Sequence, residues 1–559
     1  MKKIAAVLMF VSVTALAVAG SKIAPDLNVS NPNAIHDVII QYKTAPSKDE
    51  LKKLGPYGQI KKMYSAIRGI NIALPASVIQ VIATDPNILY ISPNRKSKGS
   101  VDISTSTVNA NMAWSYGYDG TGVGVAVVDS GITLKPDLND GNGNSRVIYS
   151  ESLVSGTDAS DPYGHGTHVA GIIGANGANS TGNGFSRTFK GIAPNVKLIN
   201  FRALDQNGSG LESDVIAAVQ RAIDLQSTFN IRVLNLSLGH QVYESYQLDP
   251  LCQVVESAWR AGIVVVVAAG NYGRDNSLGT KGYGTIASPG NDPYVITVGA
   301  TNAKGTASPG DDSIASYSSK GPTLIDHVVK PDLVAPGNGV ISLLSSPNNT
   351  IATSYPGTRI TDGTYETFGV QSAPSNDYYR LSGTSMATPV VSGAAAILLQ
   401  KDPTLTPDQV KARLMKTARK ILPSYMSAKD KLQGVLYMSQ ADIFTVGAGY
   451  LDVFAALQNN DMVSAPAMSP TVILTSAGNG NRVTVMNLVW GENLVWGENL
   501  VWGEAVFNGT LNGLNLVWGD NLVWGDATTS GFNIIWGTNL VWGDLVLTAS
   551  AFDDGDQDN

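Results

Sequence analysis

Apolar runs that end in small or polar residues recur through the middle of the chain. Four of them are continuous enough to be strands buried on both faces, and two stretches between them have the spacing of helices. The expected strands are 123–128, 196–201, 231–236 and 263–269, and the expected helices are 211–225 and 251–261. Continuous apolar strands that alternate with helices predict an α/β fold, with a mostly parallel sheet and helices on both faces. In such folds the reactive groups gather beyond the carboxyl ends of the strands.

A different order of elements precedes this region, between His36 and Lys98. The pattern there predicts strands over 38–42, over a region ending at Leu74 and over 88–91, with helices over 47–54 and 76–83. This order suits a small two-layer α+β module. The segment holds ten Lys and Arg against four Asp and Glu, whereas the whole chain has a net charge of −7. Opposite charge on two parts of one chain suggests that they dock.

The first residues have the features of a targeting segment. Two lysines precede a mainly apolar run over 4–19, which ends in the small residues of 17–19. A basic flank and a run too short to span a bilayer comfortably are typical of a cleaved secretory signal, with an uncleaved anchor as the alternative. No later run approaches membrane-spanning length. We therefore expect residues 1–19 to be a signal peptide and the mature protein to be secreted or held at the cell surface, without a membrane span.

Composition narrows the classes of protein. The chain has 559 residues, of which 43% are hydrophobic, so several domains and a large core are expected. Acidic residues outnumber basic ones, 45 to 38, which argues against nucleic acid as a partner. The single cysteine, Cys252, excludes an intramolecular disulfide and a cysteine-based zinc site. Its apolar neighbours on an expected helix favour burial.

A hexapeptide repeat occupies residues 487–559, after a linker over 459–486. Its unit, Asn-Leu-Val-Trp-Gly-Glu/Asp, contains seven of the nine tryptophans. The repeats start at Asn487, Asn493, Asn499, Asn515, Asn521 and Asn539, with a variant at Asn533. An even period keeps alternate residues on one face of an extended chain, while the Gly-acid-Asn step equally suits short Leu-Val-Trp strands joined by tight turns. The array is either an apolar, acidic patch for attachment to a surface, glycan or partner, or else a stability cap or a low-complexity segment left mobile.

Three segments of the central region carry a carboxylate, an imidazole and a hydroxyl. Asp129 ends the first expected strand, His165 and His168 share a glycine-rich segment, and Ser385 precedes a run of small apolar residues. A serine hydroxyl is a weak nucleophile unless an adjacent base takes its proton, and a histidine held by a carboxylate is such a base. Each residue alone also fits a turn, a cap or a metal ligand. Their conjunction favours nucleophilic catalysis.

Together these motifs resemble those of the subtilisin-like serine proteases, or subtilases. They read Ala-Val-Val-Asp-Ser-Gly-Ile at 126–132, Gly-His-Gly-Thr-His-Val-Ala-Gly at 164–171 and Gly-Thr-Ser-Met-Ala-Thr-Pro at 383–389. The resemblance covers residues 109–458 and keeps the family order of acid, histidine and serine. It implies a subtilisin-like catalytic domain over 101–458, in which Asp129, His165 and Ser385 form the triad of a serine endopeptidase that needs no cofactor for catalysis.

Further family elements carry over to this chain. The segment 267–271 matches the one whose asparagine donates to the oxyanion, so the resemblance assigns that role to Asn271. The residues that match substrate-binding positions are Ser237, Leu238, Gly239, Gly270 and Ala287. Ala287 stands where glycine is common, and its methyl group is expected to trim the primary specificity pocket. Asp137 lies in a segment resembling one that binds structural calcium, and a turn or cap residue is the alternative.

The module over 36–98 resembles the inhibitory propeptide of the family, a ferredoxin-like α+β domain. The resemblance implies an intramolecular inhibitor that self-cleavage removes between Asn94 and Asp102, and it implies protein or peptide substrates. The stretch between Gly337 and Ser382 has 44 residues, which predicts a longer loop than compact members have.

Three other functions fit parts of the pattern. A binding or adhesion protein on a silent protease fold, acting through its repeat tail, would not need the intact triad and Asn271. An aspartic protease needs a second Asp-Thr/Ser-Gly segment, and a histidine-pair metalloprotease needs His-Glu-x-x-His; the sequence has neither. A secreted serine endopeptidase made as a self-processing precursor is the favoured prediction.

Overall fold

The computed structural model describes residues 22–24, 27–64, 68–93, 103–277, 279–367, 370–463, 466–477, 480–486, 516–518, 522–524, 547–548 and 555–557. The chain divides into two compact units, Met1–Lys98 and Gly99–Asn559. The expected signal peptide, the expected cleavage segment and most of the repeat array lie outside the described residues. Within the described ranges, no helix has the length and apolar character needed to cross a membrane.

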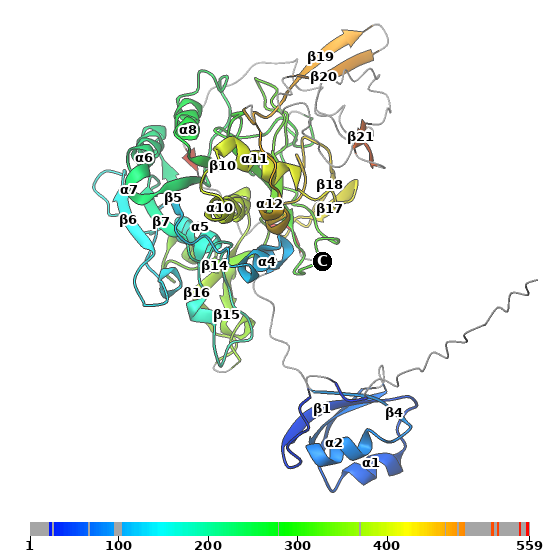
Figure 1. The fold of residues 1–559 in the computed structure, drawn as a ribbon. Helices are drawn as coiled ribbons and strands as arrows, with labels where there is room; N and C mark the ends of the chain where they lie inside the picture. Colours follow the sequence, from blue (N-terminus) through cyan, green and yellow to red (C-terminus); the bar gives the residue numbers. More distant parts are fainter. Residues whose placement is uncertain are drawn as a thin grey trace, which may run out of the picture. The chain divides into compact units, whose positions relative to one another are not determined.

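The first unit is a four-stranded antiparallel sheet with two helices (Figure 1). Its elements in chain order are β1 (Ile35–Tyr42), α1 (Lys48–Leu54), β2 (Ile60–Tyr64), β3 (Gly69–Pro75), α2 (Ala76–Ile82) and β4 (Ile88–Pro93). The sheet order is β2-β3-β1-β4. Alternate apolar residues of β1 and β3 fill a small core of their own. The unit has the α+β arrangement expected from the sequence, with the strand region that ends at Leu74 divided into β2 and β3.

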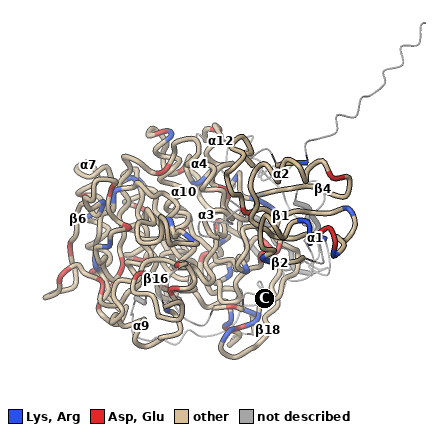
Figure 2. Tube along the Cα trace, turned by 90° about the horizontal axis from the view of Figure 1, so that it is seen from below, with Lys and Arg blue, Asp and Glu red and all other residues tan. Residues whose placement is uncertain are grey.

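Helix α1 shows how local sequence sets its limits. Ser47 accepts a hydrogen bond from the Glu50 amide at 3.2 Å, and the Glu50 carboxylate accepts one from the Ser47 amide at 2.7 Å. The helix has acidic residues in its first turn and Lys52 and Lys53 in its last, so both colours appear along it in Figure 2. This reciprocal cap and this charge order stabilise both helix ends.

The second unit is built on an eight-stranded, mostly parallel sheet, and this prediction is confirmed. Its strands are β5 (Gly124–Asp129), β6 (Val147–Ser152), β7 (Lys197–Arg202), β9 (Ile231–Leu236), β10 (Val264–Ala268), β11 (Ile296–Asn302), β12 (Ser313–Ile314) and β13 (Leu333–Pro336). The order is β12-β11-β10-β9-β5-β7-β6, with β13 beside β11. Only the short β12 pairs antiparallel with its neighbour. Strands β5 and β10 are buried along their whole length, because helices cover the sheet.

Two pairs of helices cover most of the sheet. Helix α10 packs on α5 and on strands β9, β10 and β11, and helix α6 packs on α8 and on strands β5 and β9. Their bounds are α5 (His165–Gly174), α6 (Glu212–Asp224), α8 (Pro250–Arg260) and α10 (Thr384–Lys401). The remaining helices are α3 (Ile103–Thr107), α4 (Ala110–Ser115), α7 (Gln226–Phe229), α9 (Thr350–Ser354), α11 (Pro407–Lys416) and α12 (Val453–Gln458). Cys252 lies in α8 and is buried, as its neighbours predicted, and this burial raises the pKa of its thiol.

The stretch between Gly337 and Ser382 is a small antiparallel sheet rather than the predicted long loop. Its strands are β14 (Val340–Leu343), β15 (Arg359–Thr361) and β16 (Pro374–Leu381), in the order β14-β16-β15. β14 and β15 have only four and three residues, and buried and exposed positions do not alternate strictly along the eight residues of β16, so the sequence carries no clear strand pattern. Tyr378 and Tyr379 of β16 are both buried: the Tyr378 hydroxyl donates to Asp137 and the Tyr379 hydroxyl to the Gly164 carbonyl oxygen, which ties the sheet to the rest of the unit.

The other strands of the described chain form two-stranded pairs. They are β17 (Tyr425–Lys429) with β18 (Leu436–Gln440), β19 (Thr471–Ala477) with β20 (Gly480–Met486), β21 (Leu516–Trp518) with β22 (Leu522–Trp524), and β23 (Leu547–Thr548) with β8 (Ser209–Gly210). The pair β21–β22 consists of Leu-Val-Trp from two successive repeats in antiparallel register. This is one of the two arrangements that the repeat sequence allowed.

The last described residues, Gly555 to Gln557, lie against the second unit. The buried Asp556 carboxylate accepts a hydrogen bond from the Ser316 amide at 2.6 Å and forms an ion pair with Arg274 at 3.1 Å. The backbone of Asp556 also exchanges two hydrogen bonds with the Asn338 side chain, at 2.7 and 3.0 Å. At the other end of the C-terminal region, Thr471 of β19 pairs with Val328. The chain between these points therefore begins and ends on the same unit.

Candidate active site

Asp129 and His165 form a buried pair at the carboxyl edge of the sheet. Asp129 is the last residue of β5, and His165 is the first residue of α5. Nδ1 of His165 lies 2.7 Å from Oδ1 of Asp129, and the Ser130 amide donates to the same oxygen at 2.8 Å. Because a carboxylate only accepts, the imidazole proton lies on Nδ1 and the lone pair on Nε2. Nε2 has no hydrogen-bond partner among the described residues, as a general base awaiting its proton requires.

Ser385 is the second residue of α10 and is buried. Its hydroxyl donates to the carbonyl oxygen of Ser237 at 3.1 Å, and the Ser237 hydroxyl donates to the Ser385 carbonyl oxygen at 2.9 Å. The structure therefore joins Asp129 to His165 directly, while the Ser385 hydroxyl is bonded to the end of β9 rather than to the imidazole. A hydroxyl changes direction by rotation about its Cα–Cβ bond, between staggered positions of similar energy.

A second buried acid, Asp161, fixes the start of α5, and sequence reasoning missed it. Its carboxylate accepts hydrogen bonds from the Ser130 hydroxyl at 2.8 Å and from the amides of Gly164 and Thr167 at 2.7 and 2.8 Å. The Ser130 hydroxyl in turn accepts from the Gly166 amide at 2.9 Å. Burial raises the pKa of Asp161. Its place four residues before His165 was the only available signal.

Asn271 is bound to the residue that precedes the nucleophile candidate. Its side-chain oxygen accepts hydrogen bonds from the Thr384 amide at 2.9 Å and from the Thr384 hydroxyl at 3.0 Å. The Thr384 hydroxyl also accepts from the Gly270 amide at 3.2 Å. Because the oxygen of the Asn271 amide group is held by Thr384, its NH₂ group faces the other way and remains the donor of this side chain.

The predicted substrate-binding residues lie together at the ends of β9 and β10. A two-residue bridge between His240 and Ser288, with hydrogen bonds of 3.1 and 2.8 Å, joins the segment 237–239 to Ala287. A Cβ atom at Gly239 would lie 2.5 Å from the Ser288 carbonyl oxygen, so no side chain fits there. Gly270 has a φ of 105°, and the buried Ala287 methyl group packs close to it.

Asp137 is buried in a short 3₁₀ turn, Pro136–Leu138. Its carboxylate accepts hydrogen bonds from the Tyr378 hydroxyl at 2.6 Å and the Asn179 amide at 3.2 Å, and burial raises its pKa to about 6. The guanidinium of Arg146 donates to the Asp137 carbonyl oxygen at 2.9 Å. As they stand, these oxygens have protein donors and do not fit a calcium ion. Calcium at Asp137 remains a prediction that requires those donors to move.

His168, the second histidine of the motif, has a structural position. Its Nε2–H donates to the Val340 carbonyl oxygen at 3.1 Å, and the ring lies edge-on to Tyr379 at 5.1 Å. Burial, and secondarily the charge of His165, lower its pKa to about 3. His168 is therefore neutral at neutral pH, and among the described residues it belongs to no group that could hold a metal.

The low pKa of His168 predicts a specific acid sensitivity. The unfolded chain, with a histidine pKa of about 6.5, binds this proton more readily than the folded one. Stability is therefore unaffected by His168 above pH 7, and as the pH falls from about 6 towards 3 it decreases by about 1.4 kcal/mol per unit. His168→Gln should flatten this dependence in urea titrations of the serine-blocked enzyme. His327→Gln should flatten it less: burial also lowers the pKa of His327, but that side chain is only half-buried, whereas His168 is fully buried. Equal slopes in the wild type and His168→Gln would contradict the assignment.

The mostly parallel sheet, the Asp–His pair at its carboxyl edge and a serine at the start of a buried helix define a serine hydrolase of the α/β class. Residues 120–438 match the sequence model of the Subtilase family, and the chain belongs to that family. It is accordingly a serine endopeptidase, as the sequence predicted.

Curated relatives agree with this assignment. Serine protease AprX of Bacillus subtilis (strain 168) is 39% identical over 348 residues, which cover 61% of this chain and 71% of the relative. Subtilisin E of the same strain is 34% identical over 390 residues, which cover 69% of this chain and 84% of the relative. The extracellular serine proteinase of Thermus sp. (strain Rt41A) is 32% identical over 380 residues, which cover 65% of this chain and 75% of the relative.

Proposed function

We propose that this protein is a secreted endopeptidase that matures by its own cleavage and uses Asp129, His165 and Ser385 as its catalytic triad. The observation that carries the proposal is the 2.7 Å contact of Asp129 with His165, which leaves Nε2 of the imidazole without a partner among the described residues. The intact pair favours catalysis over a silent binding protein on the same fold.

The reaction requires Ser385 to exchange its hydrogen bond with Ser237 for one with Nε2 of His165. The Ser385 oxygen then attacks the carbonyl carbon of the scissile amide while His165 takes the hydroxyl proton. The negative charge of Asp129 stabilises the imidazolium that forms. His165 next gives the proton to the leaving amine, and water repeats the sequence on the acyl-enzyme.

The oxyanion of the tetrahedral intermediate needs donors that are already in place. The NH₂ group of Asn271 is one, because its oxygen is fixed by Thr384. The backbone amide of Ser385, at the start of α10, is the other, and it adds the positive end of the helix dipole. The same contacts with Thr384 tie the position of Asn271 to that of Ser385.

The substrate is a protein or peptide, bound as an extended strand along the segment 237–239. The Ala287 methyl group narrows the space beside Gly239 and Gly270 that takes the side chain preceding the scissile bond. Such a difference of one carbon discriminates between neighbouring side chains by about 1–3 kcal/mol.

Export and maturation complete the proposal. Residues 1–19 act as the secretory signal, and 36–98 act as an inhibitory propeptide removed between Asn94 and Asp102. Two observations support this: the separate α+β unit that ends at Lys98, and a relative that is named extracellular. The repeat array over 487–559 serves attachment to a partner that its sequence does not identify.

Labelling with phenylmethylsulfonyl fluoride tests the assignment of the nucleophile. This reagent reacts with serine hydroxyls that a base activates, so we expect one adduct per chain, found by mass spectrometry on the peptide that contains Ser385. Ser237, whose hydroxyl is equally buried, should carry none. Replacement of His165 by alanine should abolish labelling although Ser385 is still present. An unmodified Ser385, or labelling that survives the loss of His165, would refute the proposed mechanism.

A further inference from the structure

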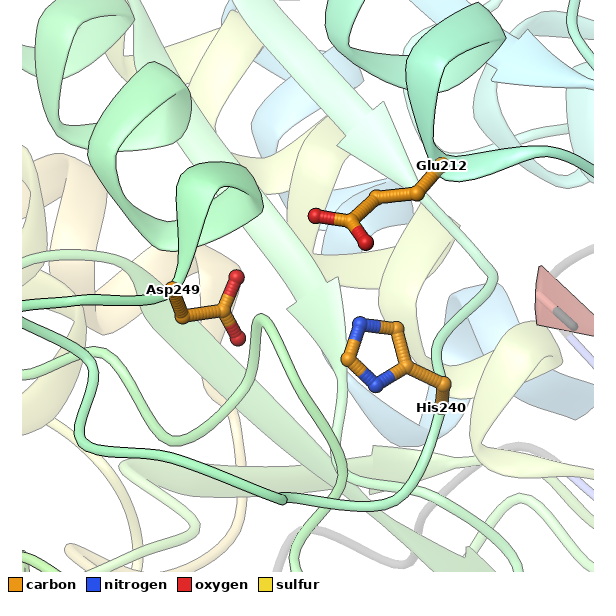
Figure 3. Close-up of side chains that lie close together, drawn as sticks. All are labelled: Glu212, His240 and Asp249. Carbon is orange, nitrogen blue, oxygen red and sulfur yellow. The ribbon is translucent and has the colours of Figure 1, made fainter. Parts of the chain in front are cut away.

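Glu212, His240 and Asp249 converge from three separate elements next to the substrate-binding segments (Figure 3). Glu212 is the first residue of α6, His240 follows the segment 237–239, and Asp249 is the N-cap of α8. One potential metal-binding atom from each residue lies within 4.8 Å of the other two. Neither the catalytic mechanism nor any motif of the sequence accounts for this cluster.

The imidazole of His240 is oriented as a ligand. Its Nδ1–H donates to the Gln241 carbonyl oxygen at 2.6 Å, so its lone pair lies on Nε2. The Nε2 side of the ring faces the two carboxylates in Figure 3, and Nε2 has no hydrogen-bond partner among the described residues. The residue is only 7% exposed. A buried acceptor without a partner is costly, and metal-binding histidines are commonly fixed by such a contact of the other nitrogen.

The two carboxylates complete the set. Oε1 of Glu212 also has no partner within the described part of the chain. Oδ1 of Asp249 accepts from the amides of Leu251 and Cys252, and Oδ2 accepts from the Ser288 hydroxyl at 2.6 Å. These contacts hold the Asp249 side chain in place and leave lone pairs on Oδ2. Two carboxylates this close repel each other unless a positive charge lies between them.

We propose that Glu212, His240 and Asp249 bind a divalent cation of the zinc class. One imidazole nitrogen and two carboxylate oxygens suit a transition metal, whereas calcium takes six to eight oxygen ligands. Three protein ligands leave a fourth position for water. Glu212 is only half-buried, which gives the ion a route from solvent.

The site would connect the two walls of the specificity pocket. The backbone of His240 is hydrogen-bonded to Ser288, the neighbour of Ala287, and Asp249 accepts from the Ser288 side chain. A cation held by His240 and Asp249 therefore braces the segment 237–240 against 287–288. We expect its loss to raise KM for peptide substrates and to lower the thermal midpoint, with little change in kcat, because Asp129 and His165 lie outside the cluster.

Metal titration of the mature enzyme tests the proposal. The protein is treated with phenylmethylsulfonyl fluoride, freed of metal with a chelator and kept in excess calcium, so that calcium sites stay filled. Zn²⁺ is then titrated by calorimetry, and Co²⁺ by its visible absorption. We expect one equivalent of each to bind, with affinity at least tenfold weaker in His240→Ala and in Glu212→Gln. His327→Ala, a histidine replacement outside the cluster, should bind as the wild type does.

A thermal scan keeps the test decisive if one variant is destabilised. Zn²⁺ should raise the thermal midpoint of the wild type and of His327→Ala, and it should leave that of Glu212→Gln unchanged. Glu212→Gln keeps the shape of a half-buried side chain, and Asp249 is left intact because it caps α8. Absence of stoichiometric Zn²⁺ and Co²⁺ binding in the wild type, or equal affinities in the wild type and both cluster variants, would overturn the proposal.

Discussion

Replacement of Ser385 by alanine is expected to abolish peptide hydrolysis and to leave the precursor uncut. The variant loses the oxygen that attacks the amide, while the Asp129–His165 pair and the Asn271 donor remain. We expect kcat to fall by about 10⁶, the size of loss established for subtilisin itself. A gel of the purified protein should show the segment 36–98 still attached, and a chromogenic peptide assay should measure the residual rate.

Ser392→Ala is the matched control for this change. Ser392 lies on the same helix, is equally buried, and its hydroxyl donates to Asn235 at 2.8 Å. Its removal costs one buried hydrogen bond, about 1 kcal/mol of stability, but takes no group from the catalytic mechanism. Normal maturation of Ser385→Ala at the wild-type rate would show that another group performs the cleavage.

Asp129→Asn is expected to lower kcat by about 10⁴, which is again the magnitude known for this type of triad, subtilisin included. Asparagine has nearly the shape of aspartate, so its oxygen keeps the hydrogen bond from Ser130. It lacks the negative charge that stabilises the His165 imidazolium in a buried site. Circular dichroism should show an unchanged fold, and steady-state kinetics should place the loss in kcat rather than KM.

Asp161→Asn provides the comparison. Asp161 is also buried and lies near the same helix start, but it contacts Ser130, Gly164 and Thr167 rather than the imidazole. We therefore expect a much smaller loss of kcat and a larger loss of stability. If Asp129→Asn retained more than a tenth of the wild-type kcat, the pair would not be the catalytic one.

The sequence predicted the parts of the fold in which local pattern and burial agree. Strand β9 has the limits expected from its apolar run, and α6 and α8 begin within one residue of the expected positions. The sheet of β14, β15 and β16 was missed because β14 and β15 are short, and because buried and exposed residues do not alternate strictly along β16. Such a sheet is specified by packing against α5 rather than by its own periodicity.

In the candidate site, too, the sequence predicted what its local motifs specify and missed what depends on packing. Asp129 and His165 could be paired from their motifs. Asp129 lies at the end of a strand and His165 at the start of a helix, and such positions meet at the carboxyl edge of a parallel sheet. The direction of the Ser385 hydroxyl could not, because it depends on the carbonyl oxygen of Ser237, which only the folded chain brings near. Glu212, His240 and Asp249 have ordinary local explanations as helix-start, loop and cap residues. Only the packing of α6 and α8 reveals that they face one another.

The attachment of Asp556 to Arg274 and Ser316 has a consequence for the repeats. A single peptide-bond cut within them does not detach the piece downstream of it, since the noncovalent contacts of Asp556 still hold that piece. A nicked molecule would give two bands under denaturing conditions and one particle in native chromatography. The segment that contains the tryptophan-rich repeats is therefore attached to the enzyme at two points, Thr471 before the repeats and Asp556 after them.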